Sequence, residues 1–215
     1  MIERKPMRPK TRVGRPRKHE TEEAGARILE TATRLFASQG FAGTSVEQVA
    51  AACGAGKDTI YRRFPSKVAL FEGVVEHARA RAMDKLAELG APEGDALTQL
   101  KRLLRSFLSI NMEPDFVALK RIAFSEAVVF GKRSPLPSQP DPIMDKLVKA
   151  VAAAQADGFL RPGDSKLLAA HLIHSLVSIP TTDAMLGGGA YAASDALDVH
   201  FETVWTWLVD GVASR

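Results

Sequence analysis

The chain of 215 residues has little of several things, and each scarcity excludes a class of protein. Its one cysteine, Cys53, excludes an internal disulfide and any zinc site built from several cysteines. Its longest apolar stretch, residues 167–179, contains two His and two Ser and is too short to span a bilayer. The polar, basic N-terminus has no apolar signal-peptide segment, and no region alternates like a β-strand. We therefore expect a soluble, cytoplasmic, all-α protein that does not contact a membrane.

Positive charge is concentrated at the N-terminus. Residues 1–20 carry eight Lys or Arg and two Glu, a net charge of +6, whereas the whole chain carries +4, so residues 21–215 carry −2. Because this segment is rich in proline and lacks apolar periodicity, we expect residues 1–20 to form a disordered basic tail. Residues 13–17 resemble an AT-hook, in which Arg15 and Arg17 would enter the minor groove of A·T-rich DNA. The alternative is a tail that only increases solubility.

Residues 44–70 have the pattern of two short helices followed by a longer one. Thr44 stands three residues before Glu47 and predicts a capping box at the start of the first helix. Gly54 breaks the apolar spacing and predicts a tight turn, because glycine tolerates left-handed backbone. Residues 57–64 then predict a second helix. This arrangement is a helix-turn-helix, whose second helix is suited to the DNA major groove.

Together with the preceding helix, this segment resembles the DNA-binding domain of the TetR (tetracycline-repressor-like) family of transcription regulators. The resemblance covers about the first third of the chain motif by motif, and beyond it only as an all-helical pattern of suitable length. Gly56 and Asp58 depart from the family pattern, which usually has Ser and Gly there; the difference bears on which bases are read. The positions that agree are Ala26 to Glu30, Leu35-Phe36, Gly40-Phe41, Thr44 to Val46, Ala50, Gly54-Ala55, Lys57, Thr59 to Tyr61, Phe64, Ser66-Lys67 and Ala69-Leu70.

The resemblance and the helix pattern together suggest phosphate contacts. Tyr61 and Lys67 look like the family's phosphate anchors, and Arg62 is a third candidate. Thr44 is expected at a helix N-terminus, where hydroxyl and backbone N–H groups suit a phosphate.

Base contacts are expected at the start of the second helix of the motif. Lys57, Asp58 and Thr59 stand where side chains can reach base edges. Lys57 could donate to guanine and Asp58 could accept from cytosine. Asp58 could equally serve only to interact with the helix dipole, and Arg63 is expected to be a surface charge.

The remaining spacing predicts a C-terminal helical bundle, for about nine helices in all. We expect a helix-turn-helix domain over residues 21–66 and an effector-binding and dimerisation domain over residues 67–215. The expected helices cover approximately residues 22–39, 44 to the break at 53–55, 57–64, 66–89, 95 to at least 108, 115–130, 141–157, 164–179 and 194–213.

The last two of these helices are apolar on more than one side, which indicates burial on two sides. Both sides could pack within one subunit, or one side could pack on a symmetry mate, which we prefer. A homodimer would place two recognition helices about one DNA turn apart on a pseudo-palindromic operator. The expected interface residues are Leu172, Leu176, His200, Thr203 and Trp207.

The resemblance also implies a pocket for a small, mostly apolar effector, whose binding would shift the helix over residues 66–89 and weaken DNA binding. The candidate lining residues are Phe107, Met112, Phe116, Phe124, Met144, His171 and His174. His171 and His174 could instead ligate a metal, but no third ligand stands nearby in the sequence. We expect no metal and no cofactor.

The sequence therefore predicts a regulator of transcription. Only the resemblance to the TetR family favours repression over activation. Its partners would be double-stranded operator DNA, a second copy of itself and a small-molecule effector. One alternative is a regulator without an effector, and another is a nonspecific nucleoid-associated protein, which the tail alone could support. An enzyme or cofactor binder is a further class, but no catalytic motif is recognisable, so we do not expect an enzyme.

Overall fold

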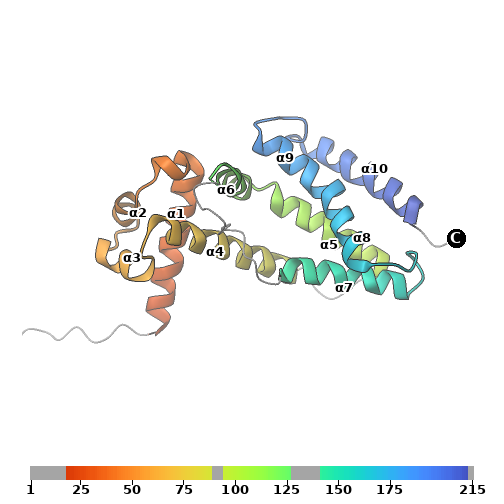
Figure 1. Ribbon diagram of the computed structural model, residues 1–215, viewed down its shortest axis with the longest axis horizontal. Coiled ribbons are helices and arrows are strands. Elements are labelled where there is room, and N and C mark those ends of the chain that lie inside the picture. The colour runs from red at the N-terminus through yellow and green to blue at the C-terminus, as the bar shows by residue number, and fades with distance from the viewer. Residues whose placement is uncertain (1–17, 89–93, 127–140, 213–215) are drawn as a thin grey trace, which may run out of the picture.

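The protein is an elongated helical molecule, shown by the computed structural model in Figure 1. The structure describes residues 18–88, 94–126 and 141–212, and within these ranges it contains helices and no β-strand. The all-α prediction is confirmed. The elements are α1 (Lys18–Gly43), α2 (Val46–Cys53), α3 (Lys57–Arg63), α4 (Lys67–Ala87), α5 (Ala96–Asn111), α6 (Pro114–Ser125), α7 (Pro142–Ala156), α8 (Ser165–Ile173), η1 (His174–Ser178), α9 (Ile179–Met185) and α10 (Ser194–Val212).

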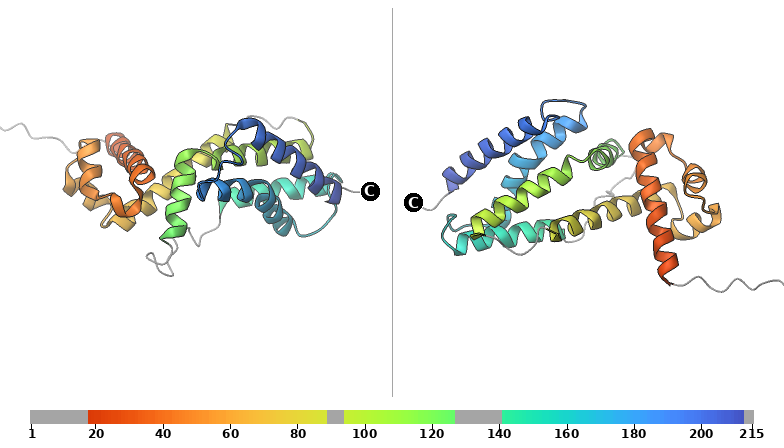
Figure 2. Two further views of the ribbon diagram at one scale, coloured as in Figure 1. Left: turned by 90° about the horizontal axis from the view of Figure 1, so that it is seen from above. Right: turned by 180° about the vertical axis from the view of Figure 1, so that it is seen from behind.

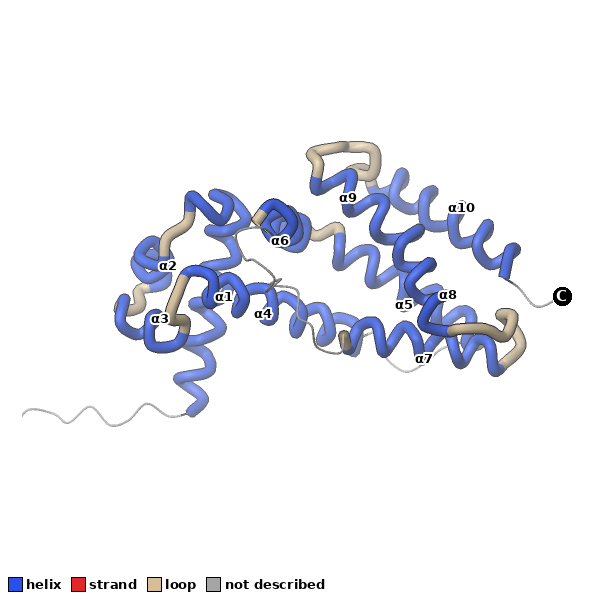
Figure 3. The backbone as a smooth tube through the Cα atoms, viewed as in Figure 1, coloured by secondary structure: helices blue, strands red, loops and turns tan. Residues whose placement is uncertain are grey.

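Helices α1, α2 and α3 form one end of the molecule around an N-terminal core, as Figures 1 and 3 show. Helix α1 begins earlier and ends later than the predicted 22–39, and a kink at Gly40 (φ 73°) separates its last residues. Besides those helices, the core takes in residues of α4 and α6. Its members are Ile28, Ala32, Phe36, Phe41, Val46, Val49, Ala50, Ile60, Phe64, Leu70, Phe71, Val74, Ala78, Leu119, Ile122 and Ala123.

The turn between α2 and α3 has the predicted geometry, but the cap of α2 lies one residue later than predicted. Gly54 is left-handed (φ 65°, ψ 24°), and its N–H closes the end of α2 on the carbonyls of residues 50 and 51. The capping box is formed by Ser45 and Gln48 rather than by Thr44 and Glu47. The correction follows from the path of the chain after the kink in α1, because Ser45 has extended backbone (φ −119°, ψ 157°) directly before α2.

Helix α4 runs from the N-terminal core into the C-terminal bundle (Figure 1). It starts at the Ser66 cap, as predicted, and its Leu70, Phe71 and Val74 are buried in the N-terminal core. Further along, Ala82 and Leu86 are buried in the C-terminal core. One helix therefore has residues in both cores, so a shift of α4 changes the packing of both.

The C-terminal core is built from α5, α7, α8, η1 and α10, and the two views of Figure 2 show these helices from above and from behind. In addition to α4 residues, its buried members are Ala96, Leu100, Leu103, Leu104, Leu108, Ile110, Ile143, Leu147, Val151, Ala154, Leu160, Ala169, Leu172, Leu176, Val177, Phe201 and Trp205. Their spacing of three and four residues along α5 and α7 matches the prediction from sequence.

The helix predicted to start near residue 164 contains a π-helical turn. Helix α8 passes without a break into η1 and then α9, so the described chain has nine continuous helical segments. Pro180 follows η1 and has no N–H to donate to the preceding turn, which accounts for the widened hydrogen-bond pattern. The buried Thr181 hydroxyl donates to the Val177 carbonyl at 2.7 Å.

Candidate functional site

Helix α3 presents polar side chains outward from a buried base. Ile60 and Phe64 are buried in the N-terminal core, as the sequence predicted. The side chains predicted to contact DNA from this helix are all exposed: Lys57, Asp58, Thr59, Tyr61 and Arg62. Helix α3 can therefore lie against a flat or grooved surface without losing its own packing.

A carboxylate on α2, which the sequence does not single out as a site residue, contacts two of these side chains. Glu47 Oε1 lies 2.5 Å from Lys57 Nζ and accepts a hydrogen bond from the Tyr61 hydroxyl at 3.4 Å. Lys57 Nζ lies 5.6 Å from the centre of the Tyr61 ring. The hydrogen bond from Lys57 lowers the pKa of Glu47, and the same bond raises the pKa of Lys57. The sequence predicts another role for Glu47: in a capping box with Thr44, its carboxylate would accept a backbone N–H at the start of α2. That interpretation hid its contacts with α3.

Two predicted phosphate contacts have other partners in the structure. Thr44 is 2% exposed, and its hydroxyl donates to the Gly40 carbonyl at 2.9 Å, so the prediction that it binds phosphate is wrong for this conformation. Lys67 Nζ donates to the Phe41 carbonyl at 2.9 Å and lies 4.4 Å from the Phe41 ring. Lys67 therefore ties the start of α4 to the end of α1.

Other basic residues lie around α3. Arg63 lies against α1, where its guanidinium would be 2.4 Å from a Cβ added at Gly25. It is thus part of the contact between α3 and α1 and not simply a surface charge. Arg15 and Arg17, the tail residues predicted to contact DNA, lie outside the described residues.

A cavity of about 160 Å³ lies between α4, α5, α6 and the start of α7. Of the residues predicted to line an effector pocket, Phe107 and Phe116 line this cavity. Met112, Phe124 and Met144 do not. Phe124 is exposed, while Met112 and Met144 pack against the C-terminal core. The full lining is Val75, Ala78, Arg79, Ala82, Phe107, Ile110, Asn111, Phe116, Leu119, Lys120, Ala123, Asp141 and Ile143.

The cavity has few polar groups, and they form two pairs. Arg79 Nη2 lies 3.2 Å from Asp141 Oδ1. Lys120 Nζ donates to the side-chain oxygen of the buried Asn111, whose Nδ2 donates in turn to the Phe107 carbonyl at 2.7 Å. Burial lowers the pKa of Lys120 to about 8.

His171 and His174 face outward from α8 and η1 and do not reach this cavity. They are therefore not part of this cavity, because the apolar residues between them occupy the inward face; His171 lines a separate, more open pocket beside residues 161–164. Among the residues that the structure describes, no group of three or more His, Cys, Asp or Glu is placed to hold a metal ion. No described helix is long and apolar enough to cross a membrane.

The predicted dimer residues fall into two groups. Leu172 and Leu176 are buried in the C-terminal core, so they cannot form an interface in this conformation. His200 is half-buried with its ring 4.9 Å from that of Tyr191, whereas Trp207 is 70% exposed. Thr203 is partly exposed on the same helix. The other large apolar side chains exposed on α8 to α10 are Leu167, Ile179, Leu186 and Val199.

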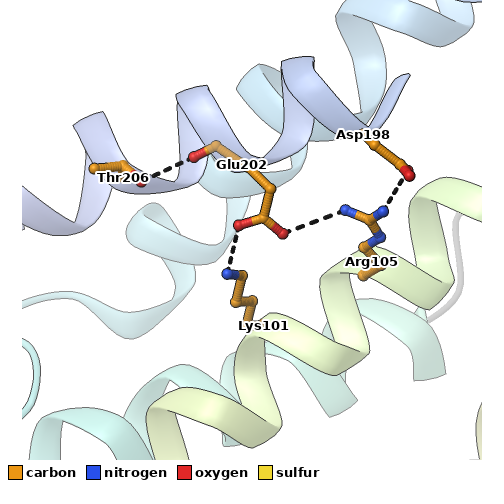
Figure 4. Close-up of polar contacts among 5 residues, drawn as sticks. All are labelled: Lys101, Arg105, Asp198, Glu202 and Thr206. Carbon is orange, nitrogen blue, oxygen red and sulfur yellow. Dashed lines mark hydrogen bonds and ion pairs between the residues drawn. The ribbon is translucent and has the colours of Figure 1, made fainter. Parts of the chain in front are cut away.

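Helix α10 is held on α5 by ion pairs, which Figure 4 shows in close-up. Lys101 Nζ lies 2.6 Å from Glu202 Oε2, and Arg105 pairs with both Asp198 and Glu202. The Arg105 guanidinium carbon also lies 5.1 Å from the Phe201 ring centre. These contacts fix which side of α10 faces the bundle and leave Trp207 on the outside.

Two family models match the chain. The model of bacterial regulatory proteins of the TetR family matches residues 28–74, which contain α2, α3 and most of the N-terminal core. The model of the C-terminal domain of AefR-like transcriptional repressors matches residues 98–204.

Curated relatives match over part of the chain, and the chain spans less than half the length of the first ones. The HTH-type transcriptional regulator AcrR of Shigella flexneri is 33% identical over 93 residues, which is 43% of each chain. YerO of Bacillus subtilis, another HTH-type regulator, is 32% identical over 102 residues. The matched region is 45% of this chain and 35% of YerO. The nucleoid occlusion factor SlmA of Vibrio atlanticus is 25% identical over 73% of this chain and 78% of its own length.

Solved structures share the fold along nearly the whole chain. A TetR-family structure from Mesorhizobium loti has a TM-score of 0.75 and 23% identity, and covers 90% of this chain and 98% of that one. A regulator from Saccharomonospora viridis in complex with choline has a TM-score of 0.72 and 22% identity, and covers 90% and 100%. With both family models matched and the helix-turn-helix in place, the chain belongs to the TetR family of DNA-binding transcriptional regulators.

Proposed function

We propose that this regulator is a homodimeric repressor, which α3 holds on a pseudo-palindromic operator until a small effector releases it. The observation that carries the proposal is the row of exposed polar side chains on α3 above a buried apolar base. Lys57, Asp58 and Thr59 at the start of α3 would read base edges. Tyr61 and Arg62 would contact phosphates, and Lys67 would support them by fixing α4 to α1.

Dimerisation would use the outward faces of α8, α9 and α10. Leu167, Ile179, Leu186, Val199 and Trp207 are exposed there, and exposed apolar residues gathered on neighbouring helices mark an interaction surface. A second copy suits this surface because a two-fold axis pairs each patch with itself and sets the spacing of two recognition helices. Thr203 remains a candidate at this interface, and the half-buried His200 a less accessible one.

The cavity between α4 and α7 is the proposed effector site. Its walls include Val75, Ala78 and Ala123, which lie beside or within the N-terminal core, and Ile110 and Ile143 from the C-terminal core. A ligand that separates these walls would therefore act on both cores at once.

Helix α6 provides a second route from the cavity besides α4. Its Leu119 and Ile122 are buried in the N-terminal core, which includes residues of α1. Arg121 on the same helix donates to the carbonyls of Met185 at 2.7 Å and Ala184 at 3.1 Å, at the end of α9. A displaced α6 would thus move α1 and the proposed dimer surface together.

Two comparisons support the repressor and effector parts of the proposal. The family model for residues 98–204 describes the C-terminal domain of transcriptional repressors. The Saccharomonospora viridis neighbour, which shares the fold, is in complex with the small molecule choline. The predicted boundary between the tail and the DNA-binding domain moves from residue 20 to residue 17, because α1 begins at Lys18. We assign DNA binding to residues 18–66 and effector binding and dimerisation to residues 67–215, with the N-terminal core extending into α4 and α6.

The experiment is selection of random duplex DNA by the purified protein at moderate salt, followed by sequencing of the retained molecules. The proposal predicts one enriched site with two-fold symmetry. Retention without a shared sequence would contradict it and favour a nonspecific DNA-binding protein dominated by the basic tail.

A further inference from the structure

Lys120 is a partly buried cation in a largely apolar cavity. The residues around it in the cavity are mostly hydrocarbon, with phenylalanine rings at positions 107 and 116. Its pKa is lowered to about 8 by burial, the only cause of the shift, so it is still largely protonated at neutral pH. A buried charge is costly unless an opposite charge or several hydrogen bonds compensate it.

The hydrogen bond to Asn111 meets only part of this need. Lysine has three N–H donors, and Asn111 accepts one of them through its side-chain oxygen. The Asn111 amide cannot turn freely, because its Nδ2 donates to the Phe107 carbonyl at 2.7 Å. Asn111 therefore orients the ammonium group in the cavity but supplies no negative charge.

The cavity's own carboxylate is committed to another cation. Asp141 lies 3.2 Å from Arg79, and it also accepts backbone N–H bonds from residues 143 and 144 at the start of α7. In the part of the chain that the structure describes, the cavity lining has two cations and one carboxylate. Residues 127–140, which precede Asp141 in sequence and are not described, contain no Asp or Glu.

We propose that the effector of this cavity is a small carboxylate, whose headgroup pairs with Lys120 and whose apolar body lies against Phe107 and Phe116. This inference rests on the proposed function, since it names the class of molecule for the proposed effector site. A carboxylate supplies both the missing negative charge and the acceptors for the remaining ammonium protons.

The size of the cavity limits the apolar body. At about 160 Å³, it is comparable to the engineered cavities of about 150 Å³ that hold one benzene molecule. One aromatic ring or a short alkyl chain would fill it. Phenylacetate, 3-phenylpropionate and hexanoate are therefore suitable probes.

The experiment compares each probe with its neutral amide, phenylacetamide, 3-phenylpropionamide or hexanamide, by calorimetry on the full chain at pH 7. We expect at least one carboxylate to bind about tenfold more tightly than its amide, the factor expected from one charged hydrogen bond. In Lys120→Met this preference should fall to about unity, and in the control Lys149→Met, at an exposed position on α7, it should persist.

The outcomes separate this inference from the proposed function. Equal binding of amide and carboxylate to the unmodified protein would overturn the carboxylate assignment while leaving the cavity as an effector site. A carboxylate preference that survives Lys120→Met would also overturn it. Binding of none of the six probes would count against both the assignment and the effector site. The comparison on the unmodified chain does not depend on the folding of any variant.

Discussion

At the scale of single residues, Glu47 determines how much positive charge α3 offers to DNA. Its carboxylate contacts Lys57 and accepts a hydrogen bond from Tyr61, so two proposed DNA contacts are engaged with the protein itself. Binding of Lys57 to a phosphate or a base would require it to leave this carboxylate or share it. Glu47 would then lower the affinity of α3 for any duplex. Only sites that offer well-placed base contacts would compensate for this loss and bind tightly.

Replacing the carboxylate should increase affinity for any duplex. We expect Glu47→Gln to bind random-sequence DNA about fivefold more tightly at low salt, because Lys57 no longer has to leave a carboxylate to reach the DNA. Fluorescence anisotropy with a labelled random duplex measures this. Glu88→Gln, the same change at an exposed position just after α4, should have no such effect. Equal or weaker binding by Glu47→Gln would contradict this role.

Lys120 should give the protein's stability a dependence on alkaline pH. Its pKa is lowered from 10.5 to about 8 by burial, so between these values the unfolded chain binds more protons than the folded one. The burial penalty is fully present below about pH 8 and is relieved as pH rises toward 10.5, by up to about 3 kcal/mol. Urea titrations from pH 7.5 to 10 measure the free energy of unfolding. Its rise with pH that is due to Lys120 should be absent in Lys120→Met and present in Lys149→Met. The same pH dependence in both variants would contradict the burial of a charged Lys120.

At the scale of elements, α2 depends on Ser45 for its start. Ser45 Oγ accepts the Gln48 N–H at 3.1 Å, and Gln48 Oε1 accepts the Ser45 N–H at 2.7 Å. We expect Ser45→Ala to lower the free energy of unfolding by about 1 kcal/mol, the usual cost of losing an N-cap, in chemical denaturation. Glu47→Gln should have a clearly smaller effect, because Glu47 is exposed. A larger destabilisation by Glu47→Gln than by Ser45→Ala would contradict this cap and support a capping box formed by Thr44 and Glu47.

Local spacing was sufficient to predict most elements. The apolar residues of α5 recur at three and four residues, and Gly54 breaks α2 from α3, so both features are visible in one dimension. The cap of α2 was misplaced because Thr44 and Glu47 satisfy the same pattern as Ser45 and Gln48, one residue apart. Only the path of the chain after the Gly40 kink decides between them.

The candidate sites were less predictable because they depend on tertiary packing. The segment α8-η1-α9 is apolar on nearly all sides, so its periodicity could not show that Leu172 and Leu176 face inward while Leu167 and Ile179 face outward. The π turn before Pro180 also shifts the later positions around the helix. Lys120 was overlooked because a lysine on a helix is ordinarily exposed, and its burial results from the meeting of α5 and α6.

At the scale of the whole molecule, two cores share α4 and α6, and the proposed DNA and dimer surfaces lie at opposite ends of this arrangement (Figure 1). Each copy offers one α3 to DNA, so tight binding to a symmetric site requires two copies with a fixed separation. The ion pairs between α5 and α10 hold the outward face of α10 in position for this contact.

Charge placed on this face should separate the copies. We expect Trp207→Asp to sediment as a monomer and to bind a selected operator at least about 100-fold more weakly, since the second α3 no longer binds within the same complex. The fold should be retained, because Trp207 is 70% exposed. Phe124→Asp, at a similarly exposed aromatic on α6, should leave the dimer intact. A dimeric Trp207→Asp protein would place the interface elsewhere.

The most direct test of the central claim is to repeat the selection of random duplex DNA with Lys57→Ala, Thr59→Ala and the control Lys149→Ala, and to compare the enriched sequences. If α3 reads the operator as part of a two-fold dimer, each α3 variant should lose preference at a pair of symmetry-related positions and keep it elsewhere, while the control should select the original site. Retention of the complete two-fold site by both α3 variants, or the absence of a shared site for the unmodified protein, would contradict the account.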